Sequence, residues 1–228
     1  MKKALVLSSG GVDSTTCLGM AIEALGRENV SAASIFYGQK HKKELEQARK
    51  IAAFYGIRQH ELDLSAIFRY SDCPLLAASG RQIEHKSYAE QIRGNGGMAS
   101  TYVPFRNGLM LSAVASLGMS LWPEDEIEIY IGAHADDAAG NAYADCSKAF
   151  TDAMDSAIRI GTYGKVRLAA PLAEMNKSQV VAAGLRLGVP YELTWSCYEG
   201  GEKPCGACAT CLDRAAAFAA NGIRDPAL

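Results

Sequence analysis

The sequence lacks three features that would point to familiar classes of protein: a membrane-length apolar run, an excess of basic charge and a Walker phosphate-binding motif. No apolar run approaches the roughly 20 residues that cross a bilayer, so we expect no contact with a membrane. The formal net charge of −2 gives no global basic field, which argues against direct binding of nucleic acid. The pattern Gly-x-x-x-x-Gly-Lys-Ser/Thr is absent, so any bound phosphate must be held by a different loop.

The length of 228 residues, with 49% hydrophobic residues, is enough for one sizeable domain or for one domain with a small appendage. The chain runs from Met1 into an apolar stretch too short for a signal peptide, so we expect a cytoplasmic location. Seven cysteines in that compartment call for a role other than disulfide bonds.

A glycine-rich turn near the N-terminus is the most informative stretch. Residues 4–7 form an apolar run typical of a buried strand, and residues 14–25 carry apolar side chains at helical spacing. Gly10 and Gly11 permit a tight turn whose N–H groups face inward beside the positive end of the helix, which suits a phosphate. The residues predicted to hold the nucleotide are Ser8, Ser9, Gly10, Gly11, Val12, Asp13, Ser14, Thr15, Thr16, Cys17 and Leu18.

The string Ser-Gly-Gly-x-Asp-Ser at residues 9–14 is more specific than a glycine turn alone. Its hydroxyls can donate to phosphate oxygens, and Asp13 can either hold Mg²⁺ or cap the helix. The string resembles the pyrophosphate loop of the N-type ATP pyrophosphatases, which implies ATP cleaved between its α and β phosphates. Residues 94–99 also fit a dinucleotide fingerprint, but no strand precedes them, so we discard that interpretation.

Strands and helices alternate along the chain. The pattern predicts strands at residues 4–7, 30–36, 59–64, 127–132 and 166–169, and helices at residues 14–25, 40–55, 106–122, 147–160 and 177–187. This alternation is typical of an α/β fold with a Rossmann-like, doubly wound and mainly parallel sheet. Ligands of such sheets bind beyond the carboxyl ends of the strands, so the loops at residues 8–15, 37–41 and 132–145 should meet there.

Residues 65–100 show no lasting period, and an irregular stretch of that length is more often a lid or insertion than a passive connection. We expect it to cover the site. We assign residues 1–190 to the ATP-binding α/β domain and residues 191–228 to a small metal-binding tail with a final helix.

Four cysteines of this tail, Cys197, Cys205, Cys208 and Cys211, fall within fifteen residues and include two consecutive Cys-x-x-Cys steps. Four thiolates can surround one tetrahedral ion, so zinc is the first choice and an iron–sulfur cluster is the alternative. A full set of cysteine ligands leaves no open position for a substrate. The predicted role of the ion is therefore structural.

With the glycine loop at one end and the cysteines at the other, the chain resembles the QueC family of 7-cyano-7-deazaguanine synthases nearly end to end. Further matching stretches are residues 37–41, 101–107, 145–146, 171–177 and 196–198. The resemblance implies an adenine nucleotide alpha hydrolase-like fold and an ATP-dependent carbon–nitrogen ligase of queuosine biosynthesis, a tRNA modification. It also implies 7-carboxy-7-deazaguanine, ammonia and ATP as small-molecule substrates, and a homodimer.

The implied reaction converts the carboxylate to a nitrile through an acyl-adenylate and an amide. Asp13, Arg106 and Lys177 are the predicted catalytic residues, because Mg²⁺ and the two cations would offset charge on the phosphates. Lys177 stands at a helix start, where the dipole disfavours a cation, and this placement favours a phosphate contact. The residues predicted to contact the acid are Tyr37, Gln39, His41, Arg106 and Asp145.

Asp145 is assigned to the guanine-like edge because a carboxylate pairs well with two N–H donors. His41 has an alternative role as a cap or surface residue, and Arg106 as the partner of a carboxylate. Cys146 is predicted to be a wall residue, since the chemistry needs no nucleophilic side chain.

The sequence departs from the pattern of the family at Phe105, at Ala144 and in the loop at residues 133–141. These departures concern the identity of the carboxylate substrate more than the use of ATP. Residues 134, 136 and 137 of that loop would contact the base or Mg²⁺, or form a solvated loop. The alternative function is a related ligase or thiolase acting on another carboxylate or on tRNA. A non-enzymatic nucleotide-binding or zinc-scaffold protein is a third possibility, although it would not need polar residues at three strand ends.

Overall fold

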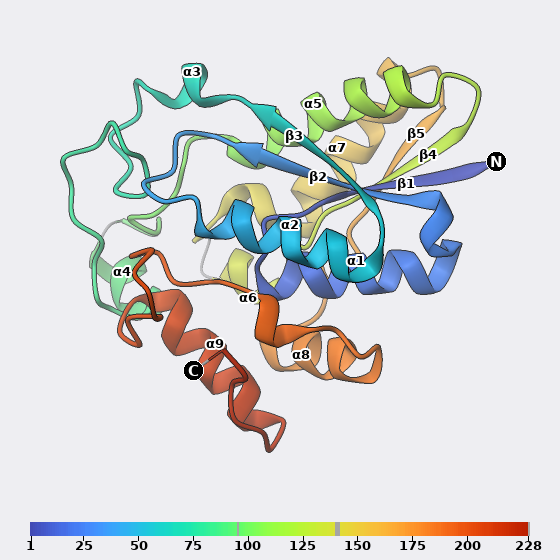
Figure 1. The fold of residues 1–228 in the computed structure, drawn as a ribbon. Helices are drawn as coiled ribbons and strands as arrows, with labels where there is room; N and C mark the ends of the chain where they lie inside the picture. The colour runs from blue at the N-terminus through green and yellow to red at the C-terminus, as the bar shows by residue number, and fades with distance from the viewer. Residues whose placement is uncertain (95, 140–141, 228) are drawn as a thin grey trace.

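The centre of the computed structural model, which describes residues 1–94, 96–139 and 142–227, is a parallel sheet (Figure 1). Within those ranges the sheet has five strands in the order β3-β2-β1-β4-β5. The strands are β1 (Lys2–Leu7), β2 (Val30–Phe36), β3 (Arg58–Asp63), β4 (Glu126–Tyr130) and β5 (Val166–Ala169). The chain builds outward from β1 to β3 and then returns to the other side of β1. The strand order therefore reverses between β1 and β4, which is where doubly wound sheets bind ligands.

Helices cover both faces of the sheet (Figure 1). The longer helices are α1 (Val12–Leu25), α2 (Lys43–Tyr55), α5 (Arg106–Leu121), α7 (Lys148–Gly161), α8 (Lys177–Arg186) and α9 (Ala209–Ala220). Side chains of β1 alternate between two cores: Leu5 packs on the α5 and α7 side, while Ala4 and Val6 pack on the side of α1, α2 and α8. The predicted parallel α/β fold is confirmed.

Two of the long helices begin two or three residues away from the predicted start. The first long helix begins at Val12 instead of residue 14, because Gly11 is already its N-cap. The second begins at Lys43 instead of residue 40. Its expected first turn is drawn into extended pairing, with a bridge between Gln39 and Leu76 and a bond from the Lys40 amide to the Leu75 carbonyl of 2.9 Å.

The stretch at residues 65–100 is largely irregular, but the expectation of no regular structure there is wrong in two places. It contains α3 (Ser65–Phe68) and α4 (Tyr88–Gly94). The loop after β4 likewise contains α6 (Ala135–Ala138) and the 3₁₀ turn η3 (Ala144–Cys146). Helices of one or two turns are too short to leave a helical period in the sequence. Residues 140–141 of that loop, and residue 95 of the discarded fingerprint, lie outside the described residues.

The tail after α8 packs back onto the body of the protein. Tyr191, in the 3₁₀ turn η4 (Tyr191–Leu193), and Phe218 of α9 share a buried cluster with Val12 and Val181. One further short turn, η1 (Arg27–Asn29), precedes β2. In the described ranges no helix combines the length and apolar character that a membrane crossing requires. The division of the chain at residue 190 stays a prediction.

Candidate active site

The glycine loop lies between the end of β1 and the start of α1, as the sequence predicts. Gly10 has a φ of +80°, and a Cβ there would lie 2.4 Å from the Glu44 carbonyl oxygen, so only glycine fits. Gly11, the N-cap of α1, has no side chain with which to bond the N–H groups of the first turn. The Ser9 and Ser14 hydroxyls lie 3.1 Å apart on the loop. The helix N-terminus and two hydroxyls are thus directed at one place, as anion binding requires.

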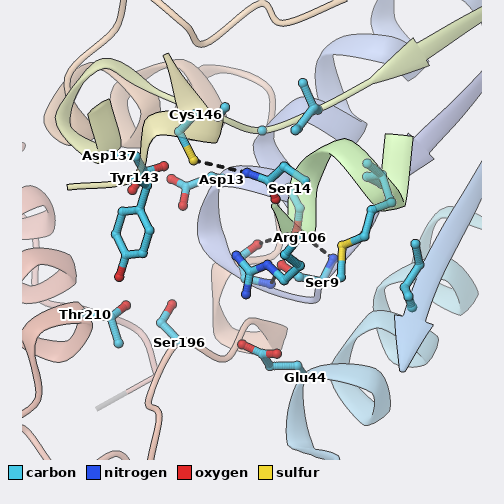
Figure 2. A pocket seen from close by; sticks show the side chains of 18 of the residues that line it. Ser9, Asp13, Ser14, Glu44, Arg106, Asp137, Tyr143, Cys146, Ser196 and Thr210 are labelled. Carbon is cyan, nitrogen blue, oxygen red and sulfur yellow. Dashed lines mark hydrogen bonds between the residues drawn. The ribbon is translucent and has the colours of Figure 1, made fainter. Parts of the chain in front are cut away.

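A cavity of about 230 Å³ opens at this loop (Figure 2). It extends from the glycine loop to the ends of β2 and β4, the start of α5 and the tail. The predicted residues that line it are Ser8, Ser9, Gly11, Asp13, Ser14, Tyr37, Gln39, Arg106 and Lys177. The first turn of α1 therefore faces the cavity, and so do all three predicted catalytic side chains.

Other predicted nucleotide-binding residues pack behind the loop instead. Val12, Cys17 and Leu18 belong to the buried clusters beneath α1. The Thr15 hydroxyl donates to the Gly11 carbonyl at 2.7 Å, and the Thr16 hydroxyl bonds to the Val12 carbonyl at 2.9 Å. These side chains hold the turn in shape and leave its backbone to face the cavity.

Lys177 and Asp13 form an ion pair at the edge of the loop. The Lys177 Nζ lies 2.6 Å from Asp13 Oδ2 and 3.3 Å from His134 Nε2, and His134 Nε2 in turn lies 3.3 Å from Asp137 Oδ1. Burial raises the pKa of Asp13, but Lys177 and His134 outweigh it and hold this pKa below its ordinary value. Burial disfavours the Lys177 ammonium, but Asp13 and Asp137 outweigh it and raise its pKa. Both partners of the pair are therefore charged at neutral pH.

The start of α8 explains how a lysine is tolerated at the positive end of a helix. Asn176 and Gln179 form a reciprocal capping box, which satisfies two backbone N–H groups. Asp136 accepts a bond from the Lys177 amide at 2.7 Å, and its charge offsets the helix dipole. The ammonium is left free to reach across to Asp13.

Arg106 occupies the first turn of α5, with its guanidinium 5.1 Å from the Tyr37 ring centroid and Nη1 3.3 Å from the Tyr37 hydroxyl. Burial opposes the charge, but Tyr37 and Cys146 outweigh this and raise its pKa. Phe105, where the family pattern has glycine, adopts a φ of +52° in the left-handed region. Its ring packs over Gly108 and against Phe150, with centroids 5.9 Å apart, and this packing offsets the cost of the backbone conformation.

Asp145 lies behind the cavity wall. Its Oδ2 accepts from the Asn107 amide at 3.0 Å, and the Asn107 side chain donates to the Asp145 carbonyl at 3.1 Å. The Asp145 carboxylate is thus an N-terminal partner of α5 and is absent from the described lining of the cavity. Cys146 does line it, and burial raises the pKa of this thiol well above its ordinary range. The thiol is neutral at physiological pH, which fits a wall residue.

The remaining predicted acid contacts belong to the loop after β2. The Gln39 side-chain oxygen accepts from the Tyr37 amide at 2.9 Å, so this glutamine shapes the turn while it lines the cavity. His41 lies outside the described lining. A Cβ on Gly200 would lie 2.2 Å from the His41 ring. The ring therefore packs directly on the backbone of residues 197–211, the segment that carries the four cysteines and is called the cysteine loop below. His41 therefore joins the body of the protein to the tail.

Sequence reasoning missed several residues that line the cavity. These are Glu44, Tyr88, Tyr143, Trp195, Ser196, Tyr198, Thr210 and Asp213. Burial raises the pKa of Glu44 to about 7 against the opposing charge of Arg106, and among the described residues no hydrogen bond reaches its carboxylate. Tyr198 lies in residues 196–198, and its match to the family is the one sequence feature that indicates a place in the site. No sequence feature indicates Tyr88, because the residues around it show no helical period. Asp213 lies on the final helix, which the sequence assigns to a structural tail.

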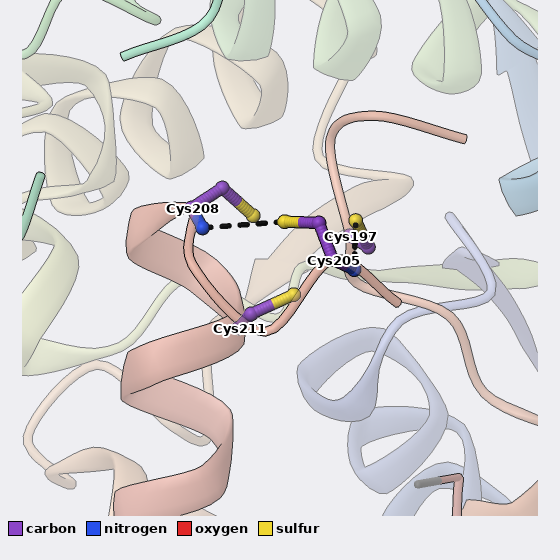
Figure 3. A group of neighbouring side chains, drawn as sticks. All are labelled: Cys197, Cys205, Cys208 and Cys211. Carbon is purple, nitrogen blue, oxygen red and sulfur yellow. Dashed lines mark hydrogen bonds between the residues drawn. The ribbon is translucent and has the colours of Figure 1, made fainter. Parts of the chain in front are cut away.

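The four tail cysteines converge as predicted (Figure 3). Their sulfur atoms all lie within 4.8 Å of one another, and Cys205 alone of the four is exposed. The Cys205 amide donates to Cys197 Sγ at 3.3 Å, and the Cys208 amide donates to Cys205 Sγ at 3.3 Å. Amide donors of this kind stabilise thiolates, and four sulfurs at this spacing fit a single tetrahedral ion.

The parallel sheet, the glycine loop at its switch point and the Asp13–Lys177 pair define a pyrophosphate-loop α/β protein. Solved structures share this fold. The U34-tRNA thiolase NcsA of Methanococcus maripaludis aligns with a TM-score of 0.50 and 16% identity, over 84% of this chain and 58% of that one. Glutamine-dependent NAD⁺ synthetase of Acinetobacter baumannii aligns with a TM-score of 0.50 and 17% identity, over 86% of this chain and 32% of that one.

Within that class the chain belongs to the QueC family. The family model described as "Queuosine biosynthesis protein QueC" matches residues 3–222. The chain is 40% identical to 7-cyano-7-deazaguanine synthase of Archaeoglobus fulgidus over 227 residues, which is 99% of this chain and 90% of the relative. It is also 40% identical to 7-cyano-7-deazaguanine synthase of Thermoplasma acidophilum over 231 residues, which is 99% of this chain and 91% of the relative.

Proposed function

We propose that the protein is a 7-cyano-7-deazaguanine synthase, a ligase that converts 7-carboxy-7-deazaguanine and ammonia to the nitrile at the expense of ATP. The observation that carries the proposal is a single cavity that brings together the glycine loop, the Asp13–Lys177 pair and Arg106. Membership of the QueC family and the name of the curated relatives support the same reaction.

The first step is activation of the acid. A carboxylate cannot be displaced by ammonia directly, because its leaving group would be oxide. Attack of the carboxylate oxygen on the α-phosphorus forms a C–O–P bond and breaks the bond between that phosphorus and the bridging oxygen. Acyl-adenylate and pyrophosphate result. In this scheme the N-terminus of α1, Ser9 and Ser14 bind the pyrophosphate, and Lys177 and Arg106 offset the charge that develops on the phosphates; their position around one cavity supports these roles.

The next steps remove the two carboxylate oxygens. Ammonia adds to the acyl carbon, AMP leaves with the first of these oxygens, and one proton is released to give the amide, which keeps the second. In a second round the amide oxygen attacks another ATP, pyrophosphate leaves and the nitrogen loses a proton. Loss of AMP and the last N–H proton then gives the nitrile. Two ATP molecules are consumed in this scheme, and no side chain forms a covalent bond.

The chain also offers sites for two metals. Asp13 Oδ1 is buried and has no hydrogen-bond partner among the described residues, so this oxygen fits as a ligand for Mg²⁺ on the phosphates. Mg²⁺ would supply further charge compensation there. We assign one structural Zn²⁺ to Cys197, Cys205, Cys208 and Cys211, because four thiolates complete its coordination. The segment 65–100 serves as a lid, since Leu75 and Tyr88 from it line the cavity. We retain the homodimer and the cytoplasmic location as predictions.

The proposal is tested by incubating the purified, zinc-loaded protein with ATP, Mg²⁺, 7-carboxy-7-deazaguanine and ammonium. Pyrophosphate and AMP should appear only with the acid present, and mass spectrometry should detect first the amide and then the nitrile. Asp13→Ala should abolish both products of ATP cleavage while the four cysteines still retain zinc. Turnover of a different carboxylate, or thiolation of tRNA, would support the alternative ligase or thiolase and refute the proposal.

A further inference from the structure

The cavity has two sides, because β1 lies between β2 and β4 in the sheet. On the β2 side the wall combines apolar Ala33, Ile35 and Leu75 with the polar side chains Tyr37, Gln39 and Glu44. On the β4 side it carries polar groups, among them Tyr143 and Asp137 (Figure 2). The proposed reaction brings two flat heterocycles to the glycine loop, one on ATP and one on the acid. Each side can hold one of them, and on the β4 side the neutral Tyr143 hydroxyl is a hydrogen-bonding group for the guanine-like base.

Two further tyrosines, of which only Tyr198 stands in a stretch that matches the family, line the cavity near Tyr143. Tyr88 comes from α4 in the segment 65–100, and Tyr198 comes from the cysteine loop. Their hydroxyl oxygens lie 2.7 Å apart, and both residues line the cavity. The Tyr88 ring also meets the Tyr143 ring edge-on, with centroids 5.8 Å apart. A tyrosine hydroxyl carries its proton at neutral pH and can therefore both donate and accept a hydrogen bond.

The two hydroxyls bond to each other, and the Tyr143 hydroxyl is a hydrogen-bonding partner of both. A hydroxyl can rotate its proton and keeps free lone pairs, so this cluster can present one O–H donor and one acceptor to a ligand. The edge of a 7-deazaguanine at N1 and C6 presents one N–H donor beside one carbonyl acceptor. The two sets are complementary, and neither hydroxyl would be left unsatisfied once the base is bound.

We propose that the Tyr88–Tyr198 hydroxyl pair binds the N1–H and C6 carbonyl edge of the acid substrate and so determines which heterocycle is accepted. This inference rests on the proposed function and names residues for recognition of the base. Because Tyr88 and Tyr198 come from different segments, the pair exists only when the lid and the cysteine loop are held together.

Further contacts hold these two segments together. His85, three residues before Tyr88, pairs with Glu199, one residue after Tyr198. The His85 Nε2 and Glu199 Oε1 atoms lie 2.7 Å apart. Ile83 packs against both the main core and the cluster formed by the cysteines. Figure 1 shows α4 beside the loop that carries the cysteines. Tyr198 directly follows Cys197, so the residue that meets the base is fixed next to a proposed metal ligand.

The test measures binding of the acid and of ATP separately by calorimetry, for Tyr88→Phe, Tyr198→Phe and the double variant. Each single variant should bind the acid about threefold to tenfold more weakly, while the Kd for ATP changes less than twofold. The double variant should be little worse than either single one, because each change breaks the same pair. Tyr70→Phe is the matched control, since Tyr70 is 80% exposed on the same segment and lies outside the described cavity lining.

An analogue of the acid that lacks the C6 oxygen provides the second measurement. Wild type should bind it about tenfold more weakly than the natural acid, and the double variant should bind both equally. The inference is overturned if the phenylalanine variants bind the acid as wild type does, if only ATP binding weakens, or if the double variant still discriminates the analogue. Pyrophosphate release by wild type with the natural acid is measured in parallel. Its absence would refute the proposed function, and its presence would confine a negative binding result to this inference.

Discussion

Replacement of Lys177 by Met tests the electrostatic centre of the site. Lys177 is 8% exposed, and its partner Asp13 has a side chain that is 24% exposed. Loss of one partner from a buried ion pair costs about 3–5 kcal/mol, and the lower end applies here because the pair borders a cavity. For a domain of this size each kcal/mol lowers Tm by about 2–4 °C, so we expect a decrease of about 6–12 °C.

The pH dependence of this loss follows from the pKa of Asp13. In the wild type this pKa is lowered from 3.8, so the stability contributed by the pair is present above about pH 4 and is lost as pH falls below it. Without Lys177 the dominant influence is burial, which raises the pKa of the carboxyl. The variant then gains stability as pH falls. The difference from wild type should therefore be largest at pH 7–8 and should shrink toward pH 5.

Denaturant unfolding at pH 5 and pH 8 and pyrophosphate release at pH 8 measure these effects. Loss of a cation from the developing phosphate charge should lower kcat about 10²- to 10³-fold. Lys148→Met is the control: its partner Asp152 lies 2.7 Å away, but the two side chains are 53% and 63% exposed. That change should cost about 0.5 kcal/mol or less. The reasoning is refuted if Lys177→Met melts within 2 °C of wild type, or if its deficit grows as the pH is lowered.

Three further variants probe the backbone turn, a buried acid and the tail. Gly10→Ala should weaken ATP binding at least tenfold by calorimetry, because its Cβ would lie 2.4 Å from a carbonyl oxygen; Gly56→Ala, at φ +65° in open space, should cost only about 1 kcal/mol and leave binding intact. Burial raises the pKa of Glu44 from 4.5 to about 7, so wild type loses stability as the pH rises from 4.5 to 7. At pH 7, Glu44→Gln should be more stable than wild type by about 1–2 kcal/mol. A difference in stability that does not change with pH would contradict this. Arg214→Lys should lower stability by about 3 kcal/mol, because it breaks a bidentate ion pair with Asp225. The two N–O distances are 2.7 and 2.9 Å, and the side chains are 5% and 3% exposed. An unchanged denaturation midpoint would count against this prediction.

The parts of the fold and site that could be predicted are those that local sequence determines. Residues 9–14 contain the whole phosphate turn, and the four cysteines lie within one short segment. The alternation of strands and helices was sufficient for the parallel sheet, because each long helix shows its own apolar period. The strand ends then had to meet, which placed Tyr37 at the cavity, whereas Lys177 was indicated by its unusual position at a helix start.

The parts that could not be predicted depend on contacts between distant segments. Asp145 follows a polar loop as a base-binding residue would, yet its carboxylate faces the Asn107 amide of another helix. Tyr88 lies in a stretch without period, and its place in the cavity depends on contacts with Tyr143 and Tyr198, which are distant in sequence. Asp213 lies on a helix that the sequence assigned to a structural tail, although it lines the same cavity as Lys177.

The tail contributes to the site more directly than a structural appendage would. The Trp195 amide donates to the Gly10 carbonyl at 2.8 Å, so the backbone of the tail holds the phosphate turn. The Trp195 indole N–H donates to the Cys197 carbonyl at 2.7 Å, and Tyr198 follows in the cavity wall. A metal ion at the cysteines would therefore fix both the proposed phosphate turn and the hydroxyl proposed to contact the base. Because these contacts run through consecutive residues, we expect loss of the ion to loosen both and to weaken binding of both substrates.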